Sequence, residues 1–326
     1  AKSASVKTYA NTAGVNAVAA HIKRIGLDGK VTNGVAPGFY DIDYKLEGEP
    51  FVSVIIPNKD HLEDLTRCIE SMEQVNNYHN LEYIVVENNS VLDETFAGYE
   101  AMKKKYGDKF KLVKWDGIFN YSAINNYGIQ SAKGDYILLL NNDTEVIEPD
   151  SLRRMLALCQ RPDVGIVGAK LLYDDNTVQH AGVIIGYQGV AGHAFAGIGD
   201  DVYGYFARAV LTQELSAVTA ACLLTKRSVF EEVDKLDETF EVAFNDIDYC
   251  MKVRKAGYKV MYEPHAKLHH YESKSRGVDN TGSKQERFGG EIMHFIDKWR
   301  PELINGDPYY NPNFELVGEL YTIKKC

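Results

Sequence analysis

The chain has 326 residues, of which 45% are hydrophobic and 25% charged, the composition of a globular protein with a sizeable core. Lys and Arg number 36 and Asp and Glu 46, which gives a formal net charge of -10 and excludes a broadly basic surface. Because no cluster of basic residues offsets this charge, nucleic acid is not expected as a partner.

The first fifty residues predict a small helical appendage followed by a linker. Apolar residues recur at helical spacing within residues 7–25, and Gly26 is suited to end that helix. The alternating stretch from Phe39 to Leu46 predicts an edge strand. We therefore divide the chain into an appendage (1–50), a main domain (51–300) and a C-terminal tail (301–326).

From Phe51 onward, strand and helix patterns alternate. The sequence predicts strands at 51–57, 83–90, 111–115 and 135–144, and helices at 61–72, 93–106 and 121–132. This alternation predicts an α/β fold, a Rossmann-like, mostly parallel sheet covered by helices on both faces. Ligands of such sheets bind beyond the carboxyl ends of the strands. Two predicted strands end in polar turns there, Glu87-Asn88-Asn89 and Asn141-Asn142-Asp143.

The second half of the domain is less regular. Strands are predicted at 164–172, 183–186 and 260–270, a strand leading into a helix at 215–233, and helices at 247–258 and 284–298. The glycine-rich loop from Gly189 to Gly199 has neither the GxxxxGK[ST] pattern nor the strand–GxGxxG–helix context of a phosphate loop. Its His193 and Phe195 could contact a sugar, and an ordinary surface loop fits the pattern equally well.

Three acidic residues are candidates for chemistry. Asp143 follows a strongly apolar strand, where a carboxylate suits Mg²⁺ or Mn²⁺, although Asn-Asn-Asp is also common turn chemistry. Asp246 and Asp248 begin a predicted helix, where Asp is a favoured cap and where a carboxylate beside aromatic residues could act as a general base. Residues two apart do not share a helix face, so we expect one to face the site and the other to cap or brace.

His269 and His270 end a predicted strand, so their side chains point to opposite faces. One of them could share a metal with an aspartate from another strand end, with diphosphate oxygens completing the coordination. Arg276 lies in the Gly-, Ser- and Arg-rich stretch 272–283, either solvated or available as a clamp for a diphosphate.

These pieces, in this order, resemble the family 2 glycosyltransferases with the GT-A fold over about residues 51–300. The segments VSVIIPNKD and VVENNS resemble the first two strands of the family, and NNYGIQSAKGDYILLLNND resembles its run from RNxG to DxD. The segment FNDIDYCMKVRKAGY resembles the family's base motif, and LHHYESKSRG resembles its closing histidine motif.

The resemblance implies a nucleotide-binding half (51–145), an acceptor half (146–300) and a single in-line displacement that inverts the anomeric centre. It maps the catalytic base to Asp246 and the metal ligands to Asp143 and His269, with His270 the less favoured choice. It also implies that the nucleotide-sugar donor is bound by Pro57, Glu87, Asn89, Asn126, Asn142 and Arg276.

The segments QHAG, TAACLLTKRSVF and HHYESKSRG are similar to bacterial enzymes that build rhamnans and O-antigens. This implies Mn²⁺- or Mg²⁺-dependent transfer from a UDP- or dTDP-linked sugar to a glycan or lipid-linked glycan. HIKRIGLDG resembles the lead-in to a transferase module of a longer chain, which would supply other transferase modules as partners. Scattered cysteines favour a reducing compartment, so we expect a cytoplasmic protein, at the inner face of the plasma membrane if the acceptor is lipid-linked.

Two other classes of function remain open from sequence. A sugar nucleotidyltransferase would share the sheet and the metal, but it needs a basic, glycine-rich loop where this chain has PNKDHLEDL. A non-catalytic module that binds a sugar or nucleotide is favoured by Asn141 and Asn245, which replace acidic residues of the resembled motifs.

Overall fold

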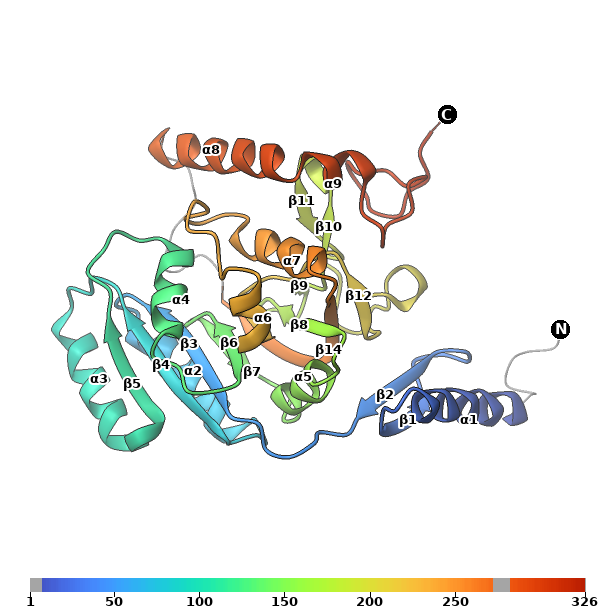
Figure 1. Cartoon of the computed structure of the whole chain (residues 1–326), viewed down its shortest axis with the longest axis horizontal. Coiled ribbons are helices and arrows are strands. Elements are labelled where there is room, and N and C mark those ends of the chain that lie inside the picture. The colour runs from blue at the N-terminus through green and yellow to red at the C-terminus, as the bar shows by residue number, and fades with distance from the viewer. Residues whose placement is uncertain (1–7, 272–281, 326) are drawn as a thin grey trace.

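The computed structural model of the chain describes residues 8–271 and 282–325 (Figure 1). Four parallel strands form the first half of a ten-stranded sheet, in the order β6 (Tyr136–Leu140), β3 (Val52–Asn58), β4 (Leu81–Glu87) and β5 (Phe110–Lys114). Their carboxyl ends therefore lie at one edge of the sheet, where the polar turns after β4 and β6 follow.

The second half of the sheet contains the antiparallel pairs. It continues from β6 through β13 (Cys222–Lys226), β8 (Val164–Leu172), β14 (Lys259–His270) and β12 (Gln213–Leu215), with β7 (Thr144–Val146) beside β14 and β9 (Val178–His180) beside β8. Strand β13 runs antiparallel to β6 and β8, whereas β8 and β14 are parallel. The expected α/β fold with a mainly parallel sheet is thus confirmed.

Helices cover both faces of the sheet. One face carries α2 (Leu62–Gln74), α3 (Asp93–Tyr106) and α5 (Ser151–Cys159), and the other carries α4 (Tyr121–Ile129), α6 (Arg227–Glu232) and α7 (Asn245–Lys255). Along β3, Val54 and Ile56 join the apolar cluster of the first face and Ile55 that of the second, because successive strand residues point to opposite faces.

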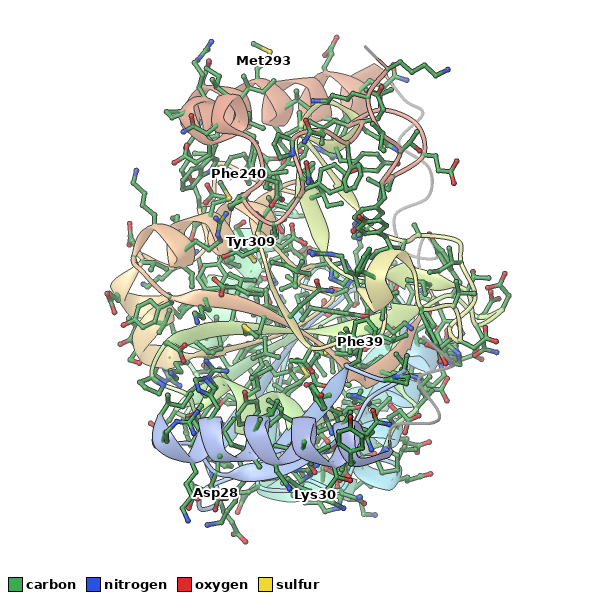
Figure 2. All side chains as sticks on the ribbon, turned by 90° about the vertical axis from the view of Figure 1, so that its right-hand side faces the viewer. Asp28, Lys30, Phe39, Phe240, Met293 and Tyr309 are labelled. Carbon is green, nitrogen blue, oxygen red and sulfur yellow. The ribbon has the colours of Figure 1, made fainter. Side chains whose placement is uncertain are left out.

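Helix α8 (Gly282–Lys298) adds a further layer above α7, and α9 (Arg300–Asn305) follows it (Figure 1). Figure 2 shows Phe240 beneath α8 and Met293 on its outer side; Phe240 is fully buried, whereas Met293 is 58% exposed. The hairpin of β10 (Val183–Ile185) and β11 (Ala191–His193) lies outside the main sheet on this same side. Apart from α4, the second face is therefore covered by segments late in the chain.

The N-terminal appendage is α1 (Thr8–Arg24) with the antiparallel pair β1 (Gly29–Asn33) and β2 (Tyr40–Tyr44). Arg154 of α5 joins it to the domain: its guanidinium donates to both carboxylate oxygens of Asp41, at 2.7 and 3.3 Å, and to Glu263 of β14 at 3.2 Å. Burial alone would raise the pKa of Asp41, but hydrogen bonds from His265 and Arg154 lower it well below its ordinary value. The appendage is thus held by a partly buried ionic cluster.

Most expected elements lie within a few residues of their predicted positions, including the helix at 7–25 and the strand within 39–46. Two differences matter for the site. Helix α5 was not expected, and the single strand expected at 135–144 is divided by the Asn141–Asp143 turn into β6 and β7. Within residues 8–271 and 282–325, no helix has both the length and the apolar character needed to span a membrane.

Candidate active site

Hydrogen bonds join the polar turns that follow β4 and β6. The Asn142 amide donates to Asn58 Oδ1 at 2.6 Å, and the Asn58 amide donates to the Tyr99 hydroxyl at 2.7 Å. Tyr99 in turn donates to Glu87 Oε2 at 2.6 Å. This chain of side chains, the rim network, fixes the two strand ends relative to each other, so the expected meeting of the two turns occurs.

The Glu87 carboxylate is buried and accepts hydrogen bonds from other residues of the chain. It is 2% exposed and accepts from the Ser90 amide and the Ser90 hydroxyl at 2.6 Å each, as well as from Tyr99. Through these contacts the oxygens of Glu87 organise the turn after β4. Asn89, in a left-handed conformation with φ of 60°, donates to the Gly117 carbonyl at 2.8 Å. Pro57 lies beside Val86 in the parallel register of β3 and β4 and is partly exposed.

Asp143 and His270 are brought together by the pairing of β7 with β14. The register places His270 opposite Thr144, and His270 Nε2 lies 3.2 Å from Asp143 Oδ1. His269 points to the other face, where its Nε2 lies 2.9 Å from Asn176 Oδ1. Of the two histidines expected as possible metal ligands, His270 is therefore the one that lies beside Asp143.

Gln179 of β9 orients the His270 ring. The Gln179 amide nitrogen donates to the His270 backbone carbonyl at 3.2 Å, so its carbonyl oxygen is the atom that faces His270 Nδ1, at 2.5 Å. Nδ1 thus faces an acceptor, and Nε2 is the ring nitrogen turned towards Asp143. A metal-binding histidine usually donates its other ring N–H to a carboxylate, a backbone carbonyl or water, and the Gln179 carbonyl can take that role for His270.

The Asp143–His270 pair fits a divalent cation with few protein ligands. A ring nitrogen and a carboxylate oxygen 3.2 Å apart are close enough to share one cation as ligands. Among the described residues there is no group of three or more His, Cys, Asp or Glu that could hold a metal. Cations bound together with substrate phosphates need only one or two protein carboxylates, so two protein ligands are compatible with Mn²⁺ or Mg²⁺.

Asp246 lines a cavity of about 400 Å³ that adjoins this pair. Asn141 connects the two, because it lines the same cavity while its amide lies 3.1 Å from His270 Nε2. Asp246 Oδ2 accepts from the Ala220 amide at 3.1 Å, and Oδ1 accepts from the Ile247 amide at 2.8 Å. The carboxylate is thus held by backbone donors at the first turn of α7, partly exposed to the cavity.

Asp248 lies two residues further and has a different position. It is fully buried, and its Oδ1 accepts from Trp299 Nε1 at 2.8 Å and lies 2.7 Å from Lys298 Nζ. Asp248 therefore fastens the end of α8 to α7, whereas Asp246 faces the cavity.

Aromatic side chains form one wall of the cavity. Phe244, which precedes α7, stacks on Phe288 of α8 with ring centroids 5.8 Å apart. Glu291 of α8 supports the same loop, because its Oε1 accepts from the amides of Val242 and Ala243 at 2.7 and 3.2 Å. An apolar wall beside a carboxylate matches the pocket expected for a general base.

Asn126, another predicted site residue, does not line this cavity. Its amide donates to the Leu236 carbonyl at 2.9 Å and to Glu238 Oε1 at 3.0 Å. Asn126 thus positions the segment before α7. Arg276 lies outside the described residues.

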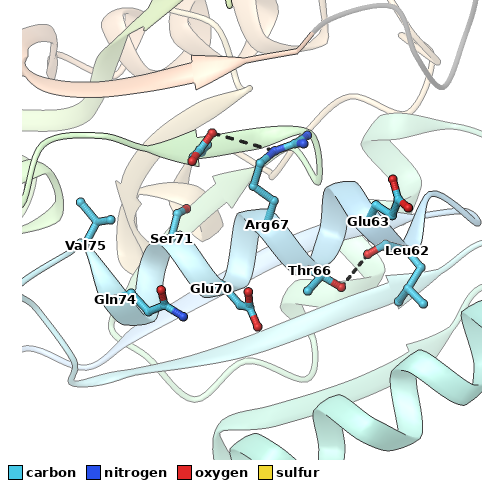
Figure 3. Close-up of a pocket in the computed structure, with 9 residues that line it drawn as sticks. Leu62, Glu63, Thr66, Arg67, Glu70, Ser71, Gln74 and Val75 are labelled. Atoms are coloured by element: carbon cyan, nitrogen blue, oxygen red, sulfur yellow. Dashed lines mark hydrogen bonds and ion pairs between the residues drawn. The ribbon is translucent and has the colours of Figure 1, made fainter.

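A second hollow runs along the outer side of α2 (Figure 3). Its central side chain, Arg67, is engaged by Asp64, lies 4.0 Å from Glu145 and covers the Tyr271 ring at 4.1 Å. Its carboxylates come from α2 and β7, and neither Asp143 nor Asp246 lines it. The cavity beside Asp246 is therefore the better candidate.

Sequence reasoning passed over Gln179 and His180. The segment QHAG that contains them served only as a mark of resemblance. A Gln-His pair next to a second histidine-bearing loop was the available signal, but it has meaning only once Gln179 of β9 is known to contact His270 of β14.

The family model described as "Glycosyl transferase family 2" matches residues 53–234. The chain is 44% identical over 318 residues to the uncharacterized protein y4gI of Sinorhizobium fredii, covering 97% of this chain and 35% of that protein. It is 37% identical over 312 residues to the O-antigen biosynthesis protein RfbC of Myxococcus xanthus, covering 94% and 24%. The chain thus spans about a third or less of these relatives.

Among solved structures, the chain is similar to GalNAc-T7, whose crystal structure is described with UDP, GalNAc and Mn²⁺. The TM-score is 0.65 at 12% identity, and the match covers 93% of this chain and 58% of that one. At this identity the likeness establishes the fold, which is the GT-A fold.

Proposed function

Because the chain belongs to glycosyl transferase family 2, and is a glycosyltransferase, we propose that it is a metal-dependent, inverting enzyme with Asp246 as the base. The observation that carries this proposal is the placement of Asp246 in a cavity that Asn141 connects to the Asp143–His270 pair. A proton acceptor and a cation-binding pair at one edge of the sheet are what transfer from a nucleotide sugar requires.

Asp143 and His270 would hold Mn²⁺ or Mg²⁺. When bound, such a cation neutralises the charge that develops on the leaving diphosphate. The chain contributes by keeping the donor atoms in place: Gln179 fixes the His270 ring, and the β7–β14 pairing brings His270 next to Asp143.

Asp246 would accept the proton of the attacking hydroxyl group. The acceptor oxygen forms the new bond to the anomeric carbon as the bond from that carbon to the diphosphate oxygen breaks. The proton moves to the Asp246 carboxylate, and the diphosphate leaves with the bonding electron pair. One displacement of this kind inverts the anomeric centre. The amides of Ala220 and Ile247 orient the carboxylate for this step.

The donor that we propose is a UDP- or dTDP-linked sugar, and the acceptor a glycan or lipid-linked glycan of a bacterial surface polysaccharide. The presence of UDP and Mn²⁺ in the GalNAc-T7 structure and the O-antigen role in the name of RfbC support these classes. We place the nucleotide near the turns after β3, β4 and β6, beside Pro57, Asn89 and Asn142. Such an acceptor would put the reaction at the cytoplasmic face of the membrane, with further transferase modules as partners.

Thermal-shift measurements with nucleoside diphosphates and sugar nucleotides, each with and without Mn²⁺, test this proposal. A ligand that binds the native state alone raises the unfolding midpoint by mass action. We expect a Mn²⁺-dependent rise with UDP or dTDP, followed by release of that nucleotide from the matching sugar nucleotide. Binding without release would instead favour a non-catalytic module, and no shift with any nucleotide would contradict the proposed donor site.

A further inference from the structure

One stripe of α8 builds the aromatic wall of the candidate active-site cavity. Phe288, Glu291 and Phe295 are spaced three and four residues apart, so they share one face of the helix. The ring of Phe244, directly before α7, packs against both ends of this stripe. Its centroid lies 5.8 Å from that of Phe288 and 5.3 Å from that of Phe295. Met293 lies on the outer side of the same helix (Figure 2).

The backbone of Phe244 is held in an unusual conformation. Its φ is 62°, in the left-handed region that a bulky residue rarely adopts. The buried Glu291 carboxylate supports this turn, because its Oε1 accepts from the amides of Val242 and Ala243. Backbone strain of this kind persists where surrounding contacts fix it, and it is concentrated at functional sites. Glu291 therefore fixes the position of the Phe244 ring.

The two ends of the α8 stripe differ in exposure. Phe295 is fully buried, whereas Phe288 is 41% exposed and lines the cavity together with Phe244 and Asp246. The rings of Phe244 and Phe288 are stacked, with an angle of 17° between their planes. Phenyl rings carry no hydrogen-bonding group of their own, so the surface that complements this wall is apolar.

Asp246 and the aromatic wall together define the chemistry of a fitting ligand. The carboxylate, held by the amides of Ala220 and Ile247, takes a proton from a hydroxyl group, whereas the wall favours C–H groups. A pyranose ring carries hydroxyl groups around its edge and C–H groups on its faces, so it meets both surfaces at once. Because Asp246 is the proposed base, the sugar that meets it is the acceptor.

We propose that the stacked rings of Phe244 and Phe288 bind the C–H face of the acceptor sugar, and that Glu291 is a positioning residue that holds Phe244 in place. This inference rests on the proposed transferase site at Asp246 and adds the surface that orients the acceptor towards it. It assigns Glu291 no contact with the substrate.

Saturation-transfer NMR of the full chain with UDP and Mn²⁺ tests the contact directly. The probes are methyl β-glucopyranoside, methyl β-galactopyranoside and methyl α-rhamnopyranoside, and the aromatic protons of the protein are irradiated. In the glucoside the ring hydrogens alternate between the two faces, so the pattern of transfer shows which face lies on the rings. We expect transfer to one face to exceed transfer to the other, and Phe288→Leu to reduce the difference. Equal transfer to both faces, or no transfer to any of the three glycosides, would overturn the proposal.

Acceptor kinetics with matched variants of α8 test the contribution of the ring. Phe288→Ala should raise the acceptor KM roughly 5- to 30-fold, because the sugar no longer covers an apolar ring. Phe288→Tyr keeps the ring and should retain the acceptor KM. Met293→Ala changes the outer side of the same helix and should match the unmodified chain. The donor KM and kcat should not change in any of these variants, because the amides of Ala220 and Ile247 hold Asp246 independently of Phe288.

Variants of Glu291 test its positioning role. Glu291→Gln keeps a carbonyl oxygen for the amides of Val242 and Ala243, whereas Glu291→Leu leaves both amides without this acceptor. Glu291→Leu should therefore raise the acceptor KM with the donor KM unchanged, and Glu291→Gln should recover most of the loss. A purely structural role would predict equal loss of donor and acceptor binding, and that result would overturn the assignment.

The two proposals fail differently. If the protein is not a transferase of the proposed kind, nucleotide binding and turnover are absent in the unmodified chain. If only the present inference is wrong, the unmodified chain turns over and Phe288→Ala has the same acceptor KM.

Discussion

Asp143 and His270 lie 3.2 Å apart at the junction of β7 and β14, with His270 held by Gln179 and Asp143 following the Asn141-Asn142 turn. The two residues are neighbours because β7 and β14 pair in the antiparallel register that places His270 opposite Thr144. The cation site of the proposed enzyme is therefore a product of strand pairing between distant segments, and the predictions below begin from it.

His270→Ala and His269→Ala form a matched pair that tests this register. His270→Ala removes the proposed ligand and should weaken Mn²⁺-dependent nucleotide binding by at least the ~10- to 100-fold that loss of outer-shell groups alone costs. His269→Ala removes a ring that contacts only Asn176 among its hydrogen bonds within the described residues, so binding should be unchanged. Calorimetric titration with UDP and Mn²⁺ measures both, and the reverse order of effects would restore His269 as the ligand.

Asp246→Asn and Asp248→Asn separate catalysis from stability. Asp246→Asn should lower kcat by roughly 10²- to 10⁴-fold, the usual effect of losing a general base, and leave nucleotide affinity unchanged. Asp248→Asn leaves Lys298 with Asp237 alone and should lower the free energy of unfolding by about 3 kcal/mol, the lower range for breaking a buried pair. Turnover assays and urea denaturation measure the two effects. Normal turnover by Asp246→Asn would refute its role as the base.

Because His180 is buried, we expect the folded chain to lose stability in mild acid. Its pKa in the folded chain is far below the ordinary value near 6.5, so below that pH the unfolded chain binds a proton that the folded chain does not. Stability contributed by His180 is thus complete above pH 6.5 and falls below it, by up to about 1.4 kcal/mol per pH unit. Comparison with His180→Asn by urea denaturation isolates this contribution. The stability advantage of the unmodified chain should shrink from pH 7 to pH 5, and a constant difference would contradict the prediction.

Arg154→Met and Arg153→Met test what holds the appendage. Arg154 is 10% exposed on its side chain and links Asp41 to the buried Glu263, so its loss should cost roughly 3–5 kcal/mol by leaving a buried charge without its partner. Arg153 pairs with Asp43 at a more exposed position, and its loss should cost at most about 1 kcal/mol. Denaturation gives the free energies, and hydrogen exchange of β2 shows whether the appendage loosens in Arg154→Met alone.

Much of the fold could be predicted because β3, β4, β6 and β8 are runs of β-branched and aliphatic residues between polar turns, a local signal. Helix α5 was not expected, although Leu152, Met155 and Leu156 recur at helical spacing, and its length is no reason, because α4 is also nine residues long and was expected. The division of β6 from β7 was also missed: the residues on either side of Asn141–Asp143 favour strands, and only the departure of β7 to pair with β14 separates them.

In the candidate site too, features set by the local sequence could be predicted, whereas features set by long-range contacts could not. The position of Asp246 at a helix start beside aromatic residues is encoded locally, and so is the opposite orientation of His269 and His270. Which histidine faces Asp143 depends on strand register, and the meeting of His180 with His193 depends on a hairpin that reverses the chain. The hydrogen bond from Tyr99 to Glu87 could not be predicted, because Tyr99 comes from a helix whose rotation the sequence does not reveal.

The rim network from Asn142 through Asn58 and Tyr99 to Glu87 has a consequence for the entropy of donor binding. Its side chains are already immobilised by one another, so a nucleotide sugar bound at the proposed donor site would not have to order them. Each rotamer-rich side chain that is ordered on binding costs roughly 0.5–1.5 kcal/mol, and a preorganised site avoids that cost. In the proposed enzyme, this rigidity would leave the selection of substrate to the shape of the rim before the donor arrives, rather than to closure of these turns around it.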